Sequence, residues 1–401
     1  MNKKILLITQ IFYPDEVSTA GLFTKLCEVL AEDNIDVEVW CAQPSYTIRK
    51  RQPSKIIYKN IDIRYLFSTN FPKNSLFGRI LNYLTFSVSL IFRLLFSKGK
   101  TLVFTHTTPP SLGILVSFLC NIKRRKFVYI LLDIFPDGLI RLGKVSDKNF
   151  FIRVWEKLNI RALERSQRIV VIGRDMKKWV IEKVKDVTEK TTYLPLWQDE
   201  RLIIPMAIEV NPFVRQNNLQ GKFIVQYSGN MGLWQDMESL GELVVSLKQG
   251  DIEFVFIGDG MRRKELLESF KGEIPSNVRF FPFQPNKHLG NVLTACHIAL
   301  ISLRDGMTGM AVPSKIYGIM AAGVPSVAMV PFDSEVAMIL KEEDCGIVVT
   351  PGDIQGLKNA IIRLKEDEEL RLKMGKNARI AFENKYTVGV IAEKYKNLII
   401  T

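Results

Sequence analysis

The chain has 401 residues, of which 47% are hydrophobic and 24% are charged. This composition excludes an intrinsically disordered chain, and the length exceeds what one hydrophobic core usually supports, so two domains are predicted. The net charge of +13 comes from one half, because residues 1–200 hold 32 Lys and Arg against 19 Asp and Glu, whereas residues 201–401 hold 23 of each. The five cysteines are odd in number and widely spaced, which argues against a disulfide framework or a zinc cluster.

Apolar runs rich in Ile, Val and Phe alternate with helical patterns in two series, which is typical of βαβ units and parallel sheets. The first series covers 3–10, 35–42, 61–67, 100–106, 126–133 and 168–173, and the second covers 222–230, 252–260, 277–283, 297–303, 324–330 and 346–352. We therefore expect an α/β protein with two Rossmann-like parallel-sheet domains that face each other across a cleft. The expected boundaries are 1–195 and 221–385, with 196–220 as a linker and 386–401 as a C-terminal helix that could pack back on the first domain.

A basic segment lies in the first domain. Residues 49–100 contain eleven Lys and Arg and a single acid, Asp62, which favours an anionic partner. Because no nucleic-acid motif accompanies the segment, we predict an anionic membrane surface and no nucleic acid.

Within that segment, residues 74–97 form a Phe- and Leu-rich helical pattern with a narrow polar stripe. Only thirteen uncharged residues separate Arg79 from Arg93, fewer than the ~20 that cross a bilayer. A spanning helix is therefore not expected, and two interpretations stay open: a helix packed in the core of the first domain, or one that lies in the membrane interface.

Glycines follow the first two strands of the second series. Gly229 and Asn230 end the first of these strands, and Gly258 and Gly260 end the second. Glycines at such places let the backbone approach a phosphate closely, although an ordinary tight turn has the same pattern. Phe283 ends the third strand and either borders a base or sugar or is a core residue.

The segment 308–325, TGMAVPSKIYGIMAAGVP, gathers several groups that bind anions. Pro313 suits the first turn of a helix, so that Ser314 and Lys315 lie at its amino end. One cation, one hydroxyl and free N–H groups together would stabilise a diphosphate leaving group. The alternative for Lys315 is a solvated surface lysine.

These pieces resemble a known family. SGNMG, FIGDG, FFPFQP and PSKIYGIMAAGVPSVA stand in the order and spacing of the donor domain of the GT-B glycosyltransferases of family 4. The likeness is strongest to bacterial enzymes that build capsule, O-antigen or exopolysaccharide repeat units, including L-fucosamine-type transferases. The resemblance implies a retaining transferase that uses a UDP- or GDP-sugar and needs neither a cofactor nor a divalent metal.

The sequence departs from the family pattern at several positions, including Leu132, where many family members have His. Family members usually have Arg at Asn230 and Lys at Gln235, and their paired glutamates fall on Met310 and Gly318. Lys315 therefore stands as the main candidate to neutralise the diphosphate, with Asn230 and Gln235 as further donor-binding residues.

The resemblance also assigns residues in the first domain. Thr19 and Gly21 stand where the family has a glycine loop near the sugar, so Gly21 is assigned to the donor and Thr19 to the acceptor. Asp133 and Asp137 follow a strand and are assigned to the acceptor. Asp133 is also the first candidate to accept a proton, unless it is only a helix cap. His106 ends another strand and is either catalytic or structural.

The expected function is transfer of a sugar to a polyprenyl-diphosphate-linked acceptor by a cytoplasmic enzyme, peripheral on the inner face of the bacterial plasma membrane. Two rivals stay open. One is a nucleotide-sugar 2-epimerase, which would invert C2 of the donor without any acceptor. The other is a catalytically degenerate subunit that recruits a true transferase to the membrane, as the missing glutamates would allow.

Overall fold

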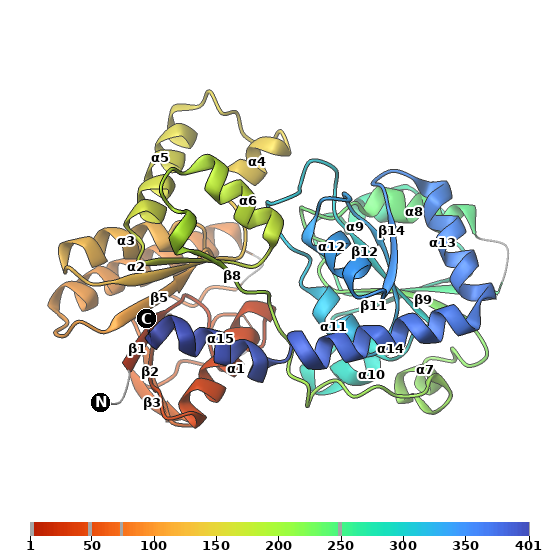
Figure 1. Ribbon diagram of the computed structural model, residues 1–401, viewed down its shortest axis with the longest axis horizontal. Coiled ribbons are helices and arrows are strands. Elements are labelled where there is room, and N and C mark those ends of the chain that lie inside the picture. Colours follow the sequence, from red (N-terminus) through yellow and green to blue (C-terminus); the bar gives the residue numbers. More distant parts are fainter. Residues whose placement is uncertain (1–3, 47–49, 73–74, 248–250, 401) are drawn as a thin grey trace. The chain divides into compact units, whose positions relative to one another are not determined.

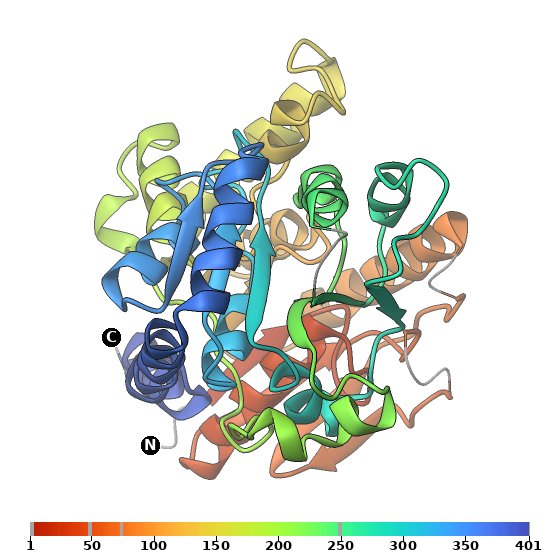
Figure 2. The ribbon, with the colours of Figure 1, turned by 90° about the vertical axis from the view of Figure 1, so that its right-hand side faces the viewer.

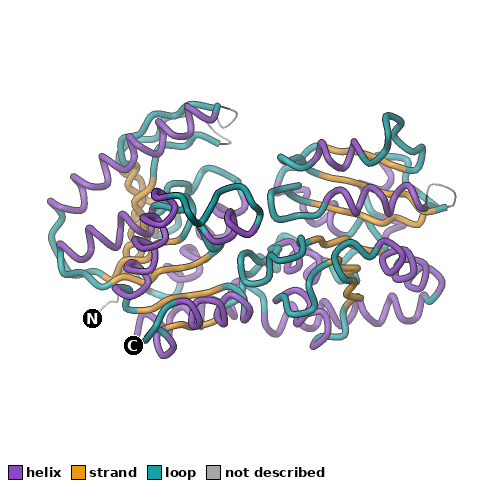
Figure 3. Tube along the Cα trace, turned by 90° about the horizontal axis from the view of Figure 1, so that it is seen from above, coloured by secondary structure: helices purple, strands orange, loops and turns teal. Residues whose placement is uncertain are grey.

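The structure is a computed structural model that describes residues 4–46, 50–72, 75–247 and 251–400. The chain divides into two compact units, unit 1 with residues 1–195 and 388–401, and unit 2 with residues 196–387. Each unit is a sheet of strands flanked by helices (Figure 3). The predicted class, α/β with two parallel-sheet domains, is confirmed. Of the basic residues in the segment 49–100, Arg49 and Lys73 lie outside the described residues.

Unit 1 is built on an eight-stranded sheet with the order β3-β4-β2-β1-β5-β6-β7-β8, in which only the β3–β4 pair is antiparallel. Its helices and strands are β1 (Lys4–Ile8), α1 (Ser18–Glu32), β2 (Asp36–Cys41), β3 (Lys55–Tyr58), β4 (Ile61–Tyr65), α2 (Leu76–Phe96), β5 (Leu102–His106), α3 (Leu112–Ile122), β6 (Phe127–Leu131), α4 (Asp137–Arg141), α5 (Phe150–Arg165), β7 (Arg168–Val171), α6 (Arg174–Lys183), β8 (Thr191–Tyr193) and α15 (Val388–Ile400).

The helices of unit 1 cover both faces of this sheet. α2, α3 and α5 lie on one face, with α3 packed between the other two, and α1 packs with α15 on the other face (Figure 1). Every residue of the central strand β6 is buried, as expected for a parallel strand covered on both sides. The Lys396 amine at the end of α15 contacts the Asp33 carboxylate at 2.9 Å, which ties α15 to the end of α1.

Unit 2 has a six-stranded, wholly parallel sheet with the order β11-β10-β9-β12-β13-β14. Its helices and strands are α7 (Pro212–Gln216), β9 (Phe223–Ser228), α8 (Met237–Ser246), β10 (Ile252–Ile257), α9 (Arg263–Glu268), β11 (Val278–Phe281), α10 (Leu289–Leu293), β12 (Ile298–Ser302), α11 (Lys315–Ala321), β13 (Ser326–Met329), α12 (Glu335–Glu342), β14 (Gly346–Val349), α13 (Ile354–Glu366) and α14 (Glu368–Lys385). α8, α9 and α13 cover one face, and α10, α11 and α14 lie on the other (Figure 1).

The segment 196–220 is packed against unit 2. Leu196, Trp197 and Ile203 are buried, and Asn211 caps α7 by accepting from two backbone N–H groups. Asn211 also donates to the carbonyl of Asn291 at 2.9 Å. The segment therefore has a fixed place in unit 2, although its sequence has no regular period.

α2 combines features of both interpretations of its sequence. By length and composition alone its residues 77–96 could cross a membrane, which is weak evidence because core helices pass the same test. Phe86, Leu90 and Leu94 are fully buried in unit 1, yet only 22% of the apolar window is buried. One side of α2 thus packs in the core of unit 1, and the other side is exposed to solvent.

Candidate active site

The sheet of unit 2 reverses its winding between β9 and β12. These neighbouring strands are connected in opposite directions along the sheet, so their carboxyl ends form a topological switch point. Open α/β sheets bind ligands at such places. The chain leaves β9 at Gly229 and leaves β12 at Leu303 and Arg304.

Two glycine turns meet at this edge. Gly229 and Gly258 have φ values of 127° and 124°, which side chains rarely tolerate. A Cβ on Gly258 would lie 2.2 Å from the Gly229 carbonyl oxygen. The N–H of Gly229 donates to the Ile257 carbonyl at 2.9 Å, and the N–H of Met231 donates to the Asp259 carbonyl at 2.9 Å. Only glycine at position 258 allows the turns after β9 and β10 to pack this closely.

Lys315 extends to the first of these turns. Its Nζ is buried and has no hydrogen-bond partner among the described residues, and the residue as a whole is half-buried. The Nζ lies 3.2 Å from the centroid of the Tyr227 ring, and it would lie 3.6 Å from a Cβ on Gly229. Burial lowers the pKa of this amine well below its usual value. An anion at Gly229 would supply the counter-charge that the amine lacks.

The other predicted donor residues in unit 2 lie around the same turns. The side-chain amides of Asn230 and Gln235 approach each other at Gly232, where an added Cβ would lie 2.7 Å from Asn230 Nδ2 and 3.0 Å from Gln235 Oε1. Gly260 is as crowded, because a Cβ there would lie 2.3 Å from the Met231 carbonyl oxygen. The residues of the two turns, after β9 and after β10, therefore pack tightly against one another.

Phe283 and Ser314 are exposed at this edge. Phe283 is 56% exposed, and its ring atom Cε1 would lie 3.2 Å from a Cβ on Gly258. Ser314 precedes α11, and its side chain makes no capping hydrogen bond. Both residues are therefore available to a ligand at the turns.

No carboxylate stands at the two positions where the family has glutamates. Met310 is fully buried, and Gly318 lies inside α11. A Cβ on Gly318 would lie 3.0 Å from Leu293 Cδ1, so a larger side chain there would require its apolar neighbour to move. These two positions therefore carry no charge, and Lys315 is the cation nearest to the Gly229 turn among the contacts described.

Sequence reasoning missed Arg304, the second residue after β12 at the switch point. Its backbone N–H donates to the Trp234 carbonyl at 2.9 Å, which ties the end of β12 to the turn after β9. Burial, and then the charge of Arg304, lower the pKa of the nearby Arg262 guanidinium. A signal that could have found it is its position two residues after a fully buried strand.

His106 lies at the corresponding switch point of the unit 1 sheet, between β1 and β5. His106 ends β5 and uses both ring nitrogens: Nδ1 accepts from the Thr108 N–H at 3.1 Å, so Nε2 carries the proton and donates to Thr9 Oγ1 at 2.9 Å. Burial lowers the pKa of His106 to about 3, and its ring stacks on Phe23. This geometry favours the structural interpretation of His106, because a base needs a free nitrogen.

Asp133 follows β6, the strand that pairs with β5. Its N–H and that of Leu132 donate to Thr107 Oγ1 at 3.2 and 3.0 Å, which fixes the chain at the end of β6. The Asp133 side chain is partly exposed. Its position at the carboxyl edge of the sheet fits the predicted contact with an acceptor hydroxyl.

Asp137, Thr19 and Gly21 have different surroundings from those expected. Asp137 begins α4, and its carboxylate forms an ion pair with Lys183. Thr19 and Gly21 belong to the first turn of α1, and a Cβ on Gly21 would meet no atom within 4 Å. The structure therefore has a helix start where a glycine loop was expected.

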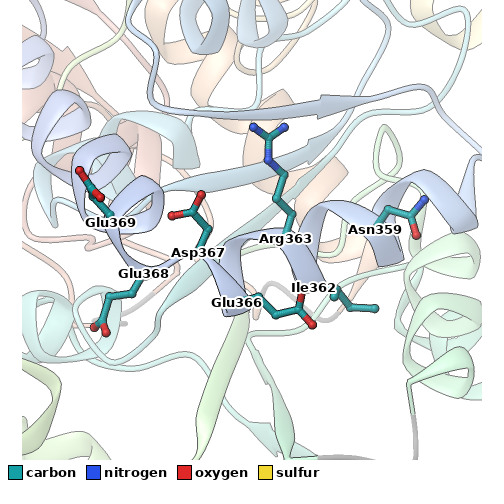
Figure 4. Close-up of a pocket in the computed structure, with 7 residues that line it drawn as sticks. All are labelled: Asn359, Ile362, Arg363, Glu366, Asp367, Glu368 and Glu369. Atoms are coloured by element: carbon teal, nitrogen blue, oxygen red, sulfur yellow. The ribbon is translucent and has the colours of Figure 1, made fainter.

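A surface hollow on unit 2 lies apart from these residues. It follows the junction of α13 and α14 and is lined by Asn359, Ile362, Arg363, Glu366, Asp367, Glu368 and Glu369 (Figure 4). No predicted site residue lines it. Within the described ranges, no group of three or more His, Cys, Asp or Glu side chains could hold a metal ion.

Comparison with known proteins finds similarity to glycosyltransferases. Residues 211–381 match the family "Glycosyl transferases group 1". The chain is 29% identical over 327 residues to the probable glycosyltransferase WbjE of Pseudomonas aeruginosa, with 80% of each chain covered. It is 26% identical over 151 residues to the UDP-Gal:alpha-D-GlcNAc-diphosphoundecaprenol alpha-1,3-galactosyltransferase of Escherichia coli, with 37% of each covered.

Solved structures agree on the fold. The Anabaena protein Alr3699/HepE in complex with UDP-glucose superposes with a TM-score of 0.72 at 17% identity, with 99% of both chains covered. Two parallel-sheet units with such neighbours define the GT-B fold. The chain has the GT-B fold, residues 211–381 are similar to the group 1 glycosyl transferases, and these relatives support glycosyltransferase activity. Its relatives include enzymes of bacterial polysaccharide biosynthesis.

Proposed function

We propose that this glycosyltransferase moves a sugar, with retention of anomeric configuration and without a divalent metal, from a UDP- or GDP-sugar to a polyprenyl-diphosphate-linked acceptor in bacterial surface polysaccharide synthesis. One observation carries the donor part of this proposal. The buried Lys315 Nζ lies beside Gly229 at the switch point of unit 2 with no hydrogen-bond partner among the described residues. A diphosphate there would provide the partner.

The leaving group determines what the donor site must do. Cleavage of the bond between sugar C1 and the diphosphate oxygen leaves negative charge on the nucleoside diphosphate. A fixed cation in a desolvated site stabilises that charge more strongly than water does. Lys315 supplies the cation in this proposal, while the crowded turns at Gly229 and Gly258 bring the backbone close to the phosphates.

Retention is assigned to attack on the face that the diphosphate leaves. The acceptor hydroxyl oxygen bonds to C1 as the C1–oxygen bond of the donor breaks, and the hydroxyl proton passes to the departing diphosphate oxygen. This step needs no nucleophilic carboxylate, in agreement with Met310 and Gly318 at the positions of the family glutamates. Asp133 would orient the acceptor hydroxyl. The family resemblance supports this mechanism.

The acceptor is assigned to unit 1, which carries all of the excess positive charge. The Escherichia coli relative is named as acting on a diphosphoundecaprenol-linked sugar, and a lipid of this kind would keep the enzyme at the membrane. We assign contact with an anionic membrane surface to residues 49–100, place the enzyme on the inner face of the plasma membrane, and expect no nucleic-acid partner.

A product assay tests the proposal. The purified chain is incubated with UDP- and GDP-sugars and a short-chain polyprenyl-diphosphate sugar in the presence of EDTA, and the anomeric configuration of the new bond is read by NMR. We expect one donor to give a product with the anomeric configuration of that donor. Inversion of the anomeric centre, a strict requirement for added metal, or C2 epimerisation of the donor without acceptor would contradict it.

A further inference from the structure

Two uncharged polar side chains of α2, those of Asn82 and Ser89, bind the chain segment 67–71 that precedes the helix. Asn82 Oδ1 accepts from the Thr69 hydroxyl at 2.8 Å and from the Phe71 N–H at 2.9 Å, and its Nδ2 donates to the Phe71 carbonyl at 3.0 Å. Ser89 donates to the Phe67 carbonyl at 2.7 Å. These side chains bind the segment 67–71, Phe86, Leu90 and Leu94 pack in the core of unit 1, and a further apolar side of α2 faces outward.

Large apolar side chains occupy the outward side of α2 over its whole length. Phe77 is 74% exposed and Phe96 is 79% exposed. The stripe between them recurs every three or four residues, which places its members on one side of a helix. Its members are Phe77, Ile80, Leu84, Val88, Phe92 and Phe96.

The same kind of surface continues across the two neighbouring helices. α3 packs against both α2 and α5, and it exposes Phe118 and Ile122. α5 exposes Phe150 and Phe151, at 72% and 78%, together with Val154 and Leu158. The start of α5, yellow in Figure 2, stands out from the body of unit 1. A water-facing helix layer with this many exposed aromatic residues is unusual, because soluble proteins keep contiguous apolar patches small.

The charges among these side chains are mainly positive. On α5, Arg153, Lys157 and Arg161 are exposed between the apolar positions, whereas Glu156 forms an ion pair with Lys183 at 2.5 Å. On α2, Arg79 and Arg93 are exposed. Basic residues interleaved with Phe and Leu complement a bilayer with anionic headgroups, since each Lys or Arg adds electrostatic attraction while the rings enter the acyl boundary.

We propose that α2, α3 and α5 form one lipid-docking face, and that Phe150 and Phe151 at the start of α5 are a membrane-inserting element separate from the segment 49–100. The occupant of this face is an anionic lipid bilayer. The inference rests on the proposed membrane location of the enzyme and extends it to a part of the chain outside the basic segment.

The test measures co-sedimentation of the full chain with vesicles of phosphatidylglycerol and phosphatidylethanolamine, and with vesicles of phosphatidylcholine alone. The Phe150→Ser/Phe151→Ser variant should bind the anionic vesicles at least tenfold more weakly than the wild type. The matched control is Leu372→Ser/Ile380→Ser, which removes two exposed apolar side chains from α14 of unit 2 and should leave binding unchanged. Circular dichroism and the melting temperature verify that each variant is folded.

A charge reversal tests the electrostatic part. Arg153→Glu/Lys157→Glu should lose binding to anionic vesicles by a similar factor, while Lys264→Glu, at an exposed lysine of α9, should not. The wild type should bind phosphatidylcholine vesicles more weakly than anionic ones.

Three results would overturn the inference. The first is wild-type binding by the Phe150→Ser/Phe151→Ser variant when Phe92→Ser/Phe96→Ser abolishes binding, because α5 would then lie outside the docking face. The second is a dimer of the wild type in sedimentation analysis that the Phe150→Ser/Phe151→Ser variant dissociates, because a second copy would then cover the face. The third is absence of vesicle binding by the wild type. If such wild-type protein is still stabilised by UDP or GDP, the donor part of the proposed function stands and only the membrane part fails.

Discussion

The Nζ of Lys315 lies 3.2 Å from the centroid of the Tyr227 ring, and the Tyr227 hydroxyl donates to the Asn230 carbonyl at 2.9 Å. The ring is therefore fixed by the turn after β9, and it holds the amine at that turn. A buried amine on an aromatic face is stabilised by cation–π attraction when charged, while burial disfavours the charge. A bound anion would therefore stabilise the charged form of Lys315.

Binding of UDP should therefore take up a proton at Lys315. Burial lowers the pKa of the free amine, and a bound diphosphate raises it again, so affinity falls as pH rises through the pKa of the complex. Calorimetry at pH 8, where the terminal phosphate of UDP with its pKa of about 6 is ionised, should give enthalpies that depend on the ionisation enthalpy of the buffer. Lys315→Arg should remove the dependence, since arginine stays protonated. Buffer-independent enthalpies for the wild type would contradict this prediction.

Gly258→Ala should destabilise unit 2 by about 2–4 kcal/mol, because the new Cβ would lie 2.2 Å from the Gly229 carbonyl oxygen at a φ of 124°. The matched control is Gly221→Ala, whose φ is 71° but whose Cβ would meet no atom within 4 Å. That change should cost only about 1–2 kcal/mol. Urea denaturation monitored by fluorescence measures both, and equal losses would show that the two turns do not constrain each other.

In the His106→Gln variant, the free energy of unfolding should decrease less as the pH falls than it does in the wild type. The folded pKa of His106 is about 3 against 6.5 in the unfolded chain, so the unfolded chain binds more protons in this window. The contribution of the neutral ring is complete above pH 6.5, and it is lost as pH falls toward 3. The expected loss between pH 7 and pH 5 is about 2 kcal/mol. Denaturation across this range should show a shallower slope for His106→Gln, whereas the exposed His288→Gln should keep the wild-type slope.

Asn82→Ala should detach the segment 67–71 from α2. Three hydrogen bonds of a buried amide are lost, and the Phe71 N–H and carbonyl lose their partners. We expect a loss of about 2–3 kcal/mol in the free energy of unfolding. Asn359→Ala, at an exposed amide of α13, should change it by less than about 0.5 kcal/mol. A neutral result for Asn82→Ala would mean that the polar side of α2 is not anchored to the segment.

Long apolar runs predicted most of the sheets, because strands buried on both faces are nearly continuous in hydrophobicity. The pattern missed β3 and β8, which are the edge strands of unit 1. β3 alternates exposed and half-buried residues, and β8 has only three residues, Thr-Thr-Tyr. Neither has the buried run that identifies a central strand.

The site shows the same division between local and long-range information. Gly229, Gly258 and Lys315 could be selected from local patterns, because strand ends and helix starts are encoded locally. The orientation of the polar stripe of α2 depends on its contact with the preceding segment 67–71. Periodicity carries no information on that contact. The contact of His106 Nε2 likewise depends on Thr9, which follows another strand, β1.

The transfer rate of Lys315 variants tests the central claim most directly. With the identified donor and a lipid-linked acceptor, Lys315→Ala should lower kcat by about 10²–10³-fold through loss of the cation that stabilises the leaving diphosphate. Lys315→Arg should recover part of this loss, and Lys264→Ala on the exposed side of α9 should retain wild-type kcat. A folded Lys315→Ala enzyme with wild-type kcat and KM would contradict the account.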